Sequence, residues 1–302
     1  MQFGGAVPAY GSSVGGSAIL EMVSAAEELG FASVWWPDHI AVPHYAAAAN
    51  LQPPFLEPLA ACAWGLSVTS RIWFGTDVLV APYRHPLSVA ATAATMTTLA
   101  GSRLVLGVGV GYLRGEFDAL GADYERRAAT TESWLETFRK PPSGYSVIAP
   151  PTPIPLWVGG NSPNALRRAA LLGDGWHPLW LPASEYRRAR DEIEAMRQEA
   201  GRAEQPFTFS FSAGMTRFAD KPSDGWPAPA QRAPKGSEFR YAPAPWIAPD
   251  GRPRLTGSPD DLTSDLQQLQ RVGVDHVTLR FGTPEVAPMV RFAQEVLPAF
   301  AR

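Results

Sequence analysis

The residues best suited to chemistry in this sequence are Asp38 and His39, which stand side by side. They follow a short apolar run, residues 32–36, whose β-branched and aromatic side chains predict a buried strand that Pro37 ends. In parallel α/β proteins, ligands bind at the C-terminal ends of the strands. A carboxylate beside an imidazole could hold and protonate a substrate there. Taken alone, the pair is better explained by a turn-capping aspartate and a surface histidine.

A second candidate is the glycine-rich segment with Gly107, Gly109 and Gly111, at the end of a predicted strand. It does not fit the dinucleotide-binding fingerprint, because Tyr112 stands where the third glycine would be. These glycines would let a flat ring or another backbone segment approach closely. Simple turn glycines are the alternative interpretation.

A third candidate is the loop that contains Gly159, Gly160 and Asn161, between a predicted strand and a helix start. Asn161 or Ser162 can cap that helix, with Pro163 near its first position. Free main-chain N–H groups and the helix dipole would together form a cradle for a phosphate. An ordinary capped loop explains the pattern equally well.

Other patterns carry less weight. The segment Gly11-Ser-Ser-Val-Gly15 matches a nucleophile elbow, but residues 8–10 separate it from the strand that should hold it. The five histidines show no metal-binding spacing, so we expect no metal site. Cys62 lies in an apolar helix and is predicted to be a small core residue.

These candidates need a scaffold that brings the ends of several strands together. Strands are predicted at residues 2–7, 32–36, 71–80, 103–109, 154–158, 175–179, 207–218 and 276–281. Helices are predicted at about 17–29 (capped by Ser17), 54–68, 86–99, 111–120, 123–139, from 163, 184–200, 259–272 and 285–300. Eight strands alternating with helices predict a (β/α)₈ TIM barrel, with a doubly wound sheet as the alternative.

We expect residues 1–302 to form a single domain. Residues 220–253 contain eight prolines, a density that excludes a regular helix and predicts a long irregular insertion after strand seven. The insertion would lie on the same face of the barrel as His39. Two interpretations stay open: a lid over that face, or an insertion with no role.

Composition limits the class of protein. Of the 302 residues, 45% are hydrophobic and 18% charged, which allows a sizeable core and excludes wholesale disorder. The net charge of −3 argues against nucleic acid or an anionic membrane as the main partner. No apolar run is long enough for a membrane span, the N-terminus lacks signal-peptide features, and a single cysteine fits a reducing compartment. We therefore expect a cytoplasmic protein.

Several segments together resemble the bacterial luciferase-like family, especially its branch of oxidoreductases that use the deazaflavin coenzyme F420. The matching segments are EELGFASVWWPDH (27–39), FGTDVLVAPYRHP (74–86), RLVLGVGVGY (103–112) with Glu116-Phe117, PLWVGGN (155–161), GDGW (173–176) and GVDHVTLR (273–280). They occur in the family's order and cover most of the chain.

The resemblance implies a tricyclic flavin-like ring at the C-terminal mouth of a barrel. Asp38 and His39 would lie against the ring, and a non-proline cis peptide at Asp77-Val78 would back it. The resemblance further assigns cofactor contacts to the glycines at 107, 109 and 111 and phosphate contacts to residues 159–161. Tyr112 stands where some relatives have a catalytic glutamate, which argues against sugar-phosphate dehydrogenase chemistry.

The reaction implied is hydride transfer between coenzyme F420 and a small organic substrate. His39 would give or take the proton, Asp38 would orient the ring or the imidazole, and Tyr112 would contact the substrate. One alternative is an FMN-dependent monooxygenase that receives reduced flavin from a separate reductase. Another is a ligand-binding barrel without catalysis. In each case we expect a homodimer with a small-molecule ligand.

Overall fold

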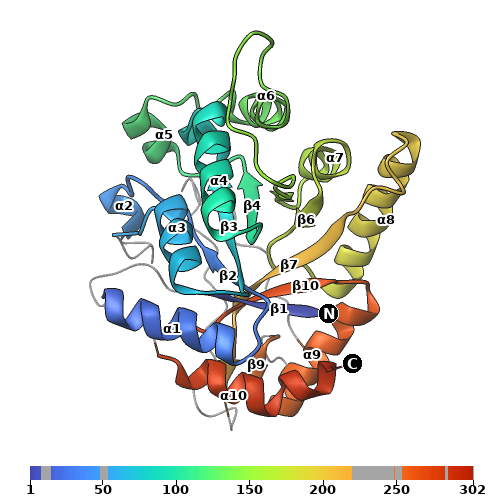
Figure 1. The fold of residues 1–302 in the computed structure, drawn as a ribbon. Coiled ribbons are helices and arrows are strands. Elements are labelled where there is room, and N and C mark those ends of the chain that lie inside the picture. The colour runs from blue at the N-terminus through green and yellow to red at the C-terminus, as the bar shows by residue number, and fades with distance from the viewer. Residues whose placement is uncertain (8–14, 48–53, 220–247, 249–253, 283–284, 302) are drawn as a thin grey trace.

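The computed structural model describes residues 1–7, 15–47, 54–219, 248, 254–282 and 285–301. Eight parallel strands close into a barrel in the order β1-β10-β7-β6-β5-β4-β3-β2, with helices around the outside (Figure 1). The barrel strands are β1 (Gln2–Ala6), β2 (Ser33–Trp36), β3 (Trp73–Val80), β4 (Leu104–Gly109), β5 (Leu156–Gly159), β6 (Gly175–His177), β7 (Thr208–Met215) and β10 (His276–Arg280). The predicted (β/α)₈ barrel is confirmed, and each predicted strand corresponds to one of these eight.

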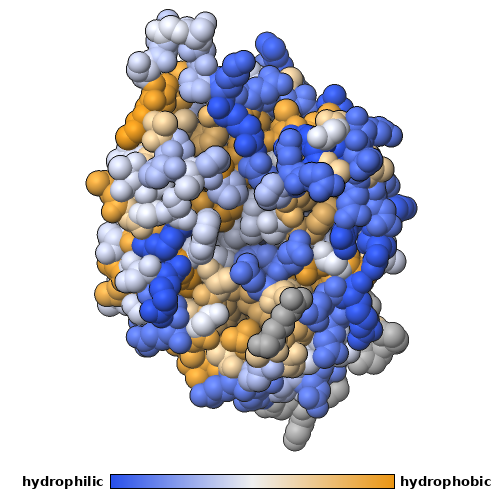
Figure 2. All heavy atoms as spheres, turned by 45° about the vertical axis from the view of Figure 1, so that its right-hand side comes forward, coloured by the Kyte–Doolittle hydropathy of each residue, from blue (hydrophilic) through white to orange (hydrophobic). Residues whose placement is uncertain are grey.

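The helices lie close to their predicted positions. They are α1 (Gly16–Glu28), α2 (His44–Ala47), α3 (Pro58–Val68), α4 (Pro86–Ala100), α5 (Arg114–Leu120), α6 (Arg127–Arg139), α7 (Pro163–Leu172), α8 (Ala183–Glu199), α9 (Pro259–Arg271) and α10 (Ala287–Glu295), with 3₁₀ turns at Ala81–Tyr83 and Leu297–Phe300. Hydrophilic residues cover much of the face turned forward in Figure 2. No described helix is long and apolar enough to span a membrane.

Several helix starts differ from the prediction, α6 among them, and three of the differences have a visible cause. The N-cap of α1 is Gly15, without a side-chain cap, so the cap predicted at Ser17 is wrong. The α3 helix begins at Pro58 because the Glu57 side chain accepts from the Ala60 N–H and caps it there. The helix predicted from Gly111 begins at Arg114, since Gly111 has a φ of 75° in the left-handed region.

Several short elements were not predicted. The α2 helix occupies part of an expected loop, and the segment predicted as one strand at 207–218 divides into β7 and β8 (Arg217–Phe218). Outside the barrel, β8 pairs in parallel with β9 (Thr256–Gly257). The predicted insertion at 220–253 lies, apart from Ala248, outside the described residues.

The barrel wall separates two environments. Side chains that point outward from the strands join the main hydrophobic core under the helices. Inside the barrel, a small separate cluster contains Ala6, Trp35, Val105 and Trp157. Most other inward positions are polar and buried: Ser33, Asp77, His177, Ser210, Ser212, His276 and Thr278. Barrels of this fold usually fill the interior with branched aliphatic residues, so this polar interior is unusual.

Candidate functional site

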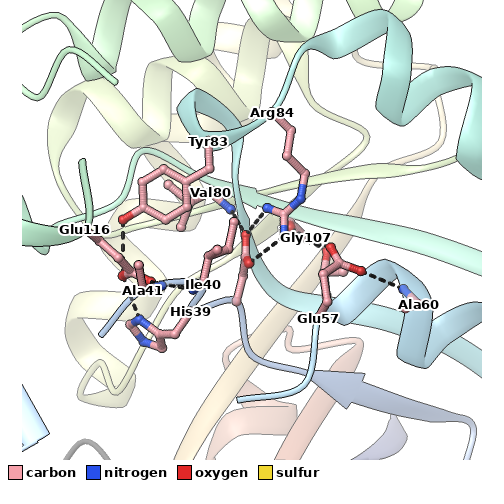
Figure 3. Close-up of polar contacts among 12 residues, drawn as sticks. His39, Ile40, Ala41, Glu57, Ala60, Val80, Tyr83, Arg84, Gly107 and Glu116 are labelled. Atoms are coloured by element: carbon pink, nitrogen blue, oxygen red, sulfur yellow. Dashed lines mark hydrogen bonds and ion pairs between the residues drawn. The ribbon is translucent and has the colours of Figure 1, made fainter. Parts of the chain in front are cut away.

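The loop after β2 brings Asp38 to the C-terminal mouth of the barrel. The Asp38 carboxylate is buried and accepts two hydrogen bonds from the Arg84 guanidinium, at 2.6 and 2.9 Å, and one from the Val80 N–H at 2.8 Å (Figure 3). Arg84 also donates to Glu57 at 2.7 Å. Asp38 therefore ties the β2 exit to the β3 exit, and Arg84 extends this link to Glu57 at the start of α3.

Burial and charge shift the pKa values of this ion pair in opposite directions. Burial raises the pKa of the Asp38 carboxyl, and the bidentate contact with Arg84 opposes that shift. Burial would lower the pKa of Arg84, but its hydrogen bonds and charge contacts with Asp38 and Glu57 outweigh burial and raise it. The pair is a structural clamp between loops, and the Asp38 carboxylate contacts Arg84 and the Val80 N–H rather than the His39 ring.

His39 is held by a residue that sequence reasoning did not select. Its Nδ1 atom lies 2.9 Å from Oε2 of Glu116, whose side chain is 1% exposed. Glu116 also accepts from the N–H groups of Ile40 (2.5 Å) and Ala41 (3.1 Å) and from the Tyr83 hydroxyl (3.2 Å) (Figure 3). One carboxylate thus fixes both the imidazole and the backbone that follows it.

The state of Glu116 follows from these donors. Burial alone would raise its pKa, but the hydrogen bond and charge contact with His39, together with the two backbone N–H groups, lower it. An ionised carboxylate can only accept, so Nδ1 of His39 must carry the proton. In the neutral ring, Nε2 is then the unprotonated nitrogen, available as a base or, once protonated, as an acid.

Two aromatic rings flank the His39 imidazole. The Phe55 ring lies 4.8 Å away between centroids, and the Tyr112 ring lies 6.0 Å away, nearly perpendicular to it. Burial, followed by the charge of Glu116, raises the pKa of Tyr112 to about 12, so its hydroxyl stays protonated near neutrality. Tyr112 is 38% exposed, which leaves it accessible from the mouth.

The end of β3 carries the predicted cis peptide, between Asp77 and Val78. The Asp77 carboxylate accepts hydrogen bonds from His177 (3.1 Å), Ser212 (2.9 Å) and Arg280 (3.0 Å). Although burial would raise its pKa, these partners, His177 foremost, hold it well below its ordinary value. Asp77 therefore joins β3 to β6, β7 and β10 across the barrel.

The glycines of β4 serve a packing purpose. A Cβ on Gly107 would lie 2.1 Å from the carbonyl oxygen of Thr76, and a Cβ on Gly109 would lie 2.5 Å from Cγ2 of Val78. Gly159 of β5 also faces the Val78 side chain. At Gly107 another backbone segment, at Thr76, approaches closely, as expected. At Gly109 the side chain of Val78 fills the space.

The loop after β5 has the geometry expected of a capped helix start. Ser162 caps α7 by accepting from the Ala165 N–H, and Gly160 has a φ of 110°. The Asn161 side chain bonds both backbone groups of Leu179, at 2.7 and 3.1 Å. Asn161 therefore anchors the loop to the β6 exit. For binding a phosphate, the loop provides main-chain N–H groups rather than the Asn161 side chain.

The residues that sequence reasoning missed stand in the segments it compared with the family. Tyr83 and Arg84 lie in the β3 exit loop, Glu116 follows the glycine-rich strand, and Arg280 ends β10. For Tyr83, Arg84 and Arg280, a polar side chain near the C-terminal end of a predicted strand was the available signal. Within the part of the chain that the structure describes, no group of three His, Cys, Asp or Glu side chains could hold a metal ion.

The family model of the luciferase-like monooxygenases matches residues 1–226 of the chain. An uncharacterized protein of Mycobacterium tuberculosis is 31% identical over 214 residues, covering 62% of this chain and 74% of that protein. A phthiodiolone/phenolphthiodiolone dimycocerosates ketoreductase of the same species is 29% identical over 215 residues, covering 60% and 56% of the two chains.

Solved structures share the fold over the whole chain. An F420-dependent secondary alcohol dehydrogenase has a TM-score of 0.76 at 20% identity and covers 100% of this chain and 99% of that one. The coenzyme F420-dependent tetrahydromethanopterin reductase of Methanopyrus kandleri has a TM-score of 0.72 at 20% identity and covers 99% of each. A monooxygenase of Streptomyces bottropensis has a TM-score of 0.74 at 19% identity and covers 100% of each.

Proposed function

The chain belongs to the luciferase-like monooxygenase family of enzymes, and on that premise we propose that it transfers a hydride between coenzyme F420 and a small organic carbonyl or alcohol. The observation that carries the proposal is the His39–Glu116 pair at the barrel mouth, which leaves Nε2 of His39 ready to exchange a proton. The ketoreductase relative and the F420-dependent alcohol dehydrogenase fold support the same class of reaction.

The residues at the mouth fit a flat cofactor with a phosphate group. Val78 fills the space over Gly109 and Gly159 and so gives the mouth a compact apolar wall against which a ring can pack. The N-terminus of α7 offers main-chain N–H groups and the positive end of its dipole to a phosphate. When bound there, the deazaflavin would supply the hydride-transfer chemistry.

The chain's own residues would supply the proton. Nε2 of His39 would take the hydroxyl proton when an alcohol is oxidised and give a proton to the oxygen when a carbonyl is reduced. Glu116 would hold the imidazole in position and stabilise its protonated form, as a carboxylate does for a catalytic histidine elsewhere. Tyr112 would contact the substrate from the loop after β4.

For Asp38 we propose a different role from the one the family resemblance implied. We assign it to positioning, because its carboxylate is committed to Arg84 and to the Val80 N–H. By holding the β2 and β3 exits together, it would fix the backbone that carries His39 on one side and Val78 on the other.

FMN-dependent monooxygenation is the second candidate function. The description of the family and the shared fold of the Streptomyces bottropensis monooxygenase favour it. Under that reaction a separate reductase would provide reduced flavin. The expected homodimer belongs to both candidates and is tested by light scattering of the purified chain.

The deciding experiment is a fluorescence titration of the purified protein with coenzyme F420 and, separately, with FMN. Tight binding of F420, followed by its reduction in the presence of small secondary alcohols, supports the proposal. Tight binding of FMN alone favours the monooxygenase. The His39→Ala variant should bind the cofactor nearly as well as the natural protein and lose turnover; equal turnover would refute the role of His39.

A further inference from the structure

The inner face of β10 carries three buried polar atoms without a hydrogen-bond partner among the described residues. They are Nδ1 of His276, Oγ1 of Thr278 and Nε of Arg280. These are alternate residues of one strand, so their side chains lie on the same face of it. Nearly all buried polar atoms in folded proteins are bonded, so three in succession on one strand indicate a common ligand.

His276, Thr278 and Arg280 form a row along β10, and His276, at the N-terminal end of this row, borders a cavity. The cavity has a volume of about 320 Å³, opens at the N-terminal end of the barrel, and is also lined by Ser33, Trp35 and Trp157. Nε2 of His276 lies 2.7 Å from the Ser33 hydroxyl. Burial lowers the pKa of His276 to about 3, so the ring is neutral near pH 7 and each nitrogen requires one partner.

In the middle of the row, the neighbouring strands carry small residues. Thr278 lies opposite Ser212 of β7 and opposite Gly4 of β1 in the strand register. The other nearby inward residues, Ala6 and Ser210, are also small. Short side chains therefore stand on the β7 side of Thr278, whereas on the β1 side the Trp35 indole covers Gly4.

At the upper end, Arg280 reaches the mouth. Its side chain is 25% exposed, and one of its terminal nitrogens donates to Asp77 at 3.0 Å. The charge of Arg280 lowers the pKa of Tyr112 against the larger effects of burial and Glu116, so the two side chains lie near each other. Tyr112 in turn contacts the His39 ring. The row thus begins at a cavity below the barrel and ends beside the proposed reaction centre.

We propose that the inner face of β10 binds a file of water molecules that joins the N-terminal cavity to the mouth and carries protons between them. Water suits the row because it can donate to a ring nitrogen, exchange either role with a hydroxyl, and accept from a guanidinium N–H. At about 3.3 Å per residue, His276 and Arg280 are roughly 13 Å apart, a span for about four waters.

The transport role rests on the proposed function. Reduction of a carbonyl by hydride takes up one proton at oxygen, and oxidation of the alcohol releases one. A cofactor bound over the mouth would restrict exchange with solvent from above. A proton would then pass along the file by successive hydrogen-bond transfers that leave each water chemically unchanged.

A high-resolution crystal structure of the full chain without cofactor tests the file itself. We expect ordered water within hydrogen-bond distance of all three atoms. In the Thr278→Val variant the central water should be lost, and in the matched Thr278→Ser variant it should be retained. A dry interior with the same side-chain positions would overturn the proposal, as would direct pairing of the three atoms with other side chains.

Solvent isotope effects test transport. Thr278→Val should slow turnover and raise the solvent deuterium isotope effect, whereas Thr278→Ser should keep the natural isotope effect. Equal isotope effects in both variants would overturn proton transport. Whether the file of water molecules exists is decided separately by the crystal structures. Absence of turnover in the natural protein with either cofactor would instead count against the proposed function, and the two failures are thus distinguishable.

Discussion

Oε2 of Glu116 lies 2.9 Å from Nδ1 of His39, although 77 positions separate the two residues in the chain. Glu116 comes from the first turn of α5 and His39 from the loop after β2. Because the same carboxylate also accepts from the N–H groups of Ile40 and Ala41, the imidazole and its backbone are fixed as one unit. The proposed proton transfer depends on this contact.

Replacing Glu116 with Gln should lower kcat by roughly 10²- to 10⁴-fold, the contribution of a positioned acid–base group. The amide N–H₂ of Gln would donate toward Nδ1 and so favour the tautomer whose Nε2 already carries hydrogen. Steady-state kinetics over pH 5–9 should also show a changed pH profile, with cofactor affinity retained. An unchanged pH profile with only a stability loss would reduce Glu116 to a packing residue.

Replacing Tyr83 with Phe is a milder change at the same carboxylate. It removes one neutral hydrogen bond to Glu116, 3.2 Å long, and leaves the contact with His39 in place. We expect a change in kcat much smaller than that of Glu116→Gln, since three donors to the carboxylate remain. Parallel kinetic measurement of the two variants checks the order; a loss in Tyr83→Phe equal to that in Glu116→Gln would contradict it.

Replacing Arg84 with Met should destabilise the protein by about 3–5 kcal/mol, because it leaves the buried Asp38 carboxylate without its charged partner. Urea unfolding measures the change. Arg114→Met, in the exposed pair with Glu125, is the matched control and should alter stability little. Similar losses of stability in both variants would show that the Arg84–Asp38 pair stabilises the protein no more than an exposed ion pair does.

Stability should fall as pH is lowered from about 6.5 toward 3. Burial lowers the pKa of His276 in the folded protein to about 3. Between that value and the unfolded value near 6.5, the unfolded chain takes up a proton that the folded chain does not, which costs up to about 1.4 kcal/mol per pH unit. Asp77 adds a separate loss at lower pH, below the unfolded aspartate pKa near 3.9, because its folded pKa is depressed.

Urea unfolding at several pH values between 7 and 4 checks this slope. The His276→Gln variant should lose it, whereas His85→Gln, at an exposed histidine, should keep it. A slope that survives in His276→Gln would assign the effect to other groups.

Replacing Gly107 with Ala should destabilise the barrel by about 1–3 kcal/mol or more, since the added methyl would overlap the Thr76 carbonyl oxygen. Gly16→Ala is the contrasting variant: nothing lies within 4 Å of a Cβ there, in the first turn of α1. That change should raise stability by roughly 0.5–1 kcal/mol. Thermal unfolding of the two variants compares them directly.

The sequence predicted the fold because its signals are local. The apolar strands, the proline at the start of α4 and the serine cap of α7 each depend on residues close together in the chain. The cis peptide and the positions of Asp38, His39 and Asp77 at strand ends came from the family resemblance together with the strand pattern. Helix starts failed where a single side chain or φ angle decided them, as at Glu57 and Gly111.

The contacts within the site could not be predicted in the same way. Nothing in the segment around Asp38 indicates that its carboxylate pairs with Arg84 rather than with the adjacent histidine. The Glu116 contact depends on the direction of α5 relative to the β2 exit, which is a property of the closed barrel. The polar interior is likewise invisible until the strand register shows which alternate residues face inward.

Val78 has a consequence for how this family can vary. Its side chain occupies space left by glycines on two other strands, at positions 107, 109 and 159. A larger residue at position 109 or 159 is tolerated only if residue 78 becomes smaller, and a smaller residue 78 would leave a gap that these two positions must fill, whereas Gly107 is fixed by the Thr76 carbonyl oxygen. Across related sequences, positions 78, 109 and 159 should therefore change together rather than independently, as one inherited set.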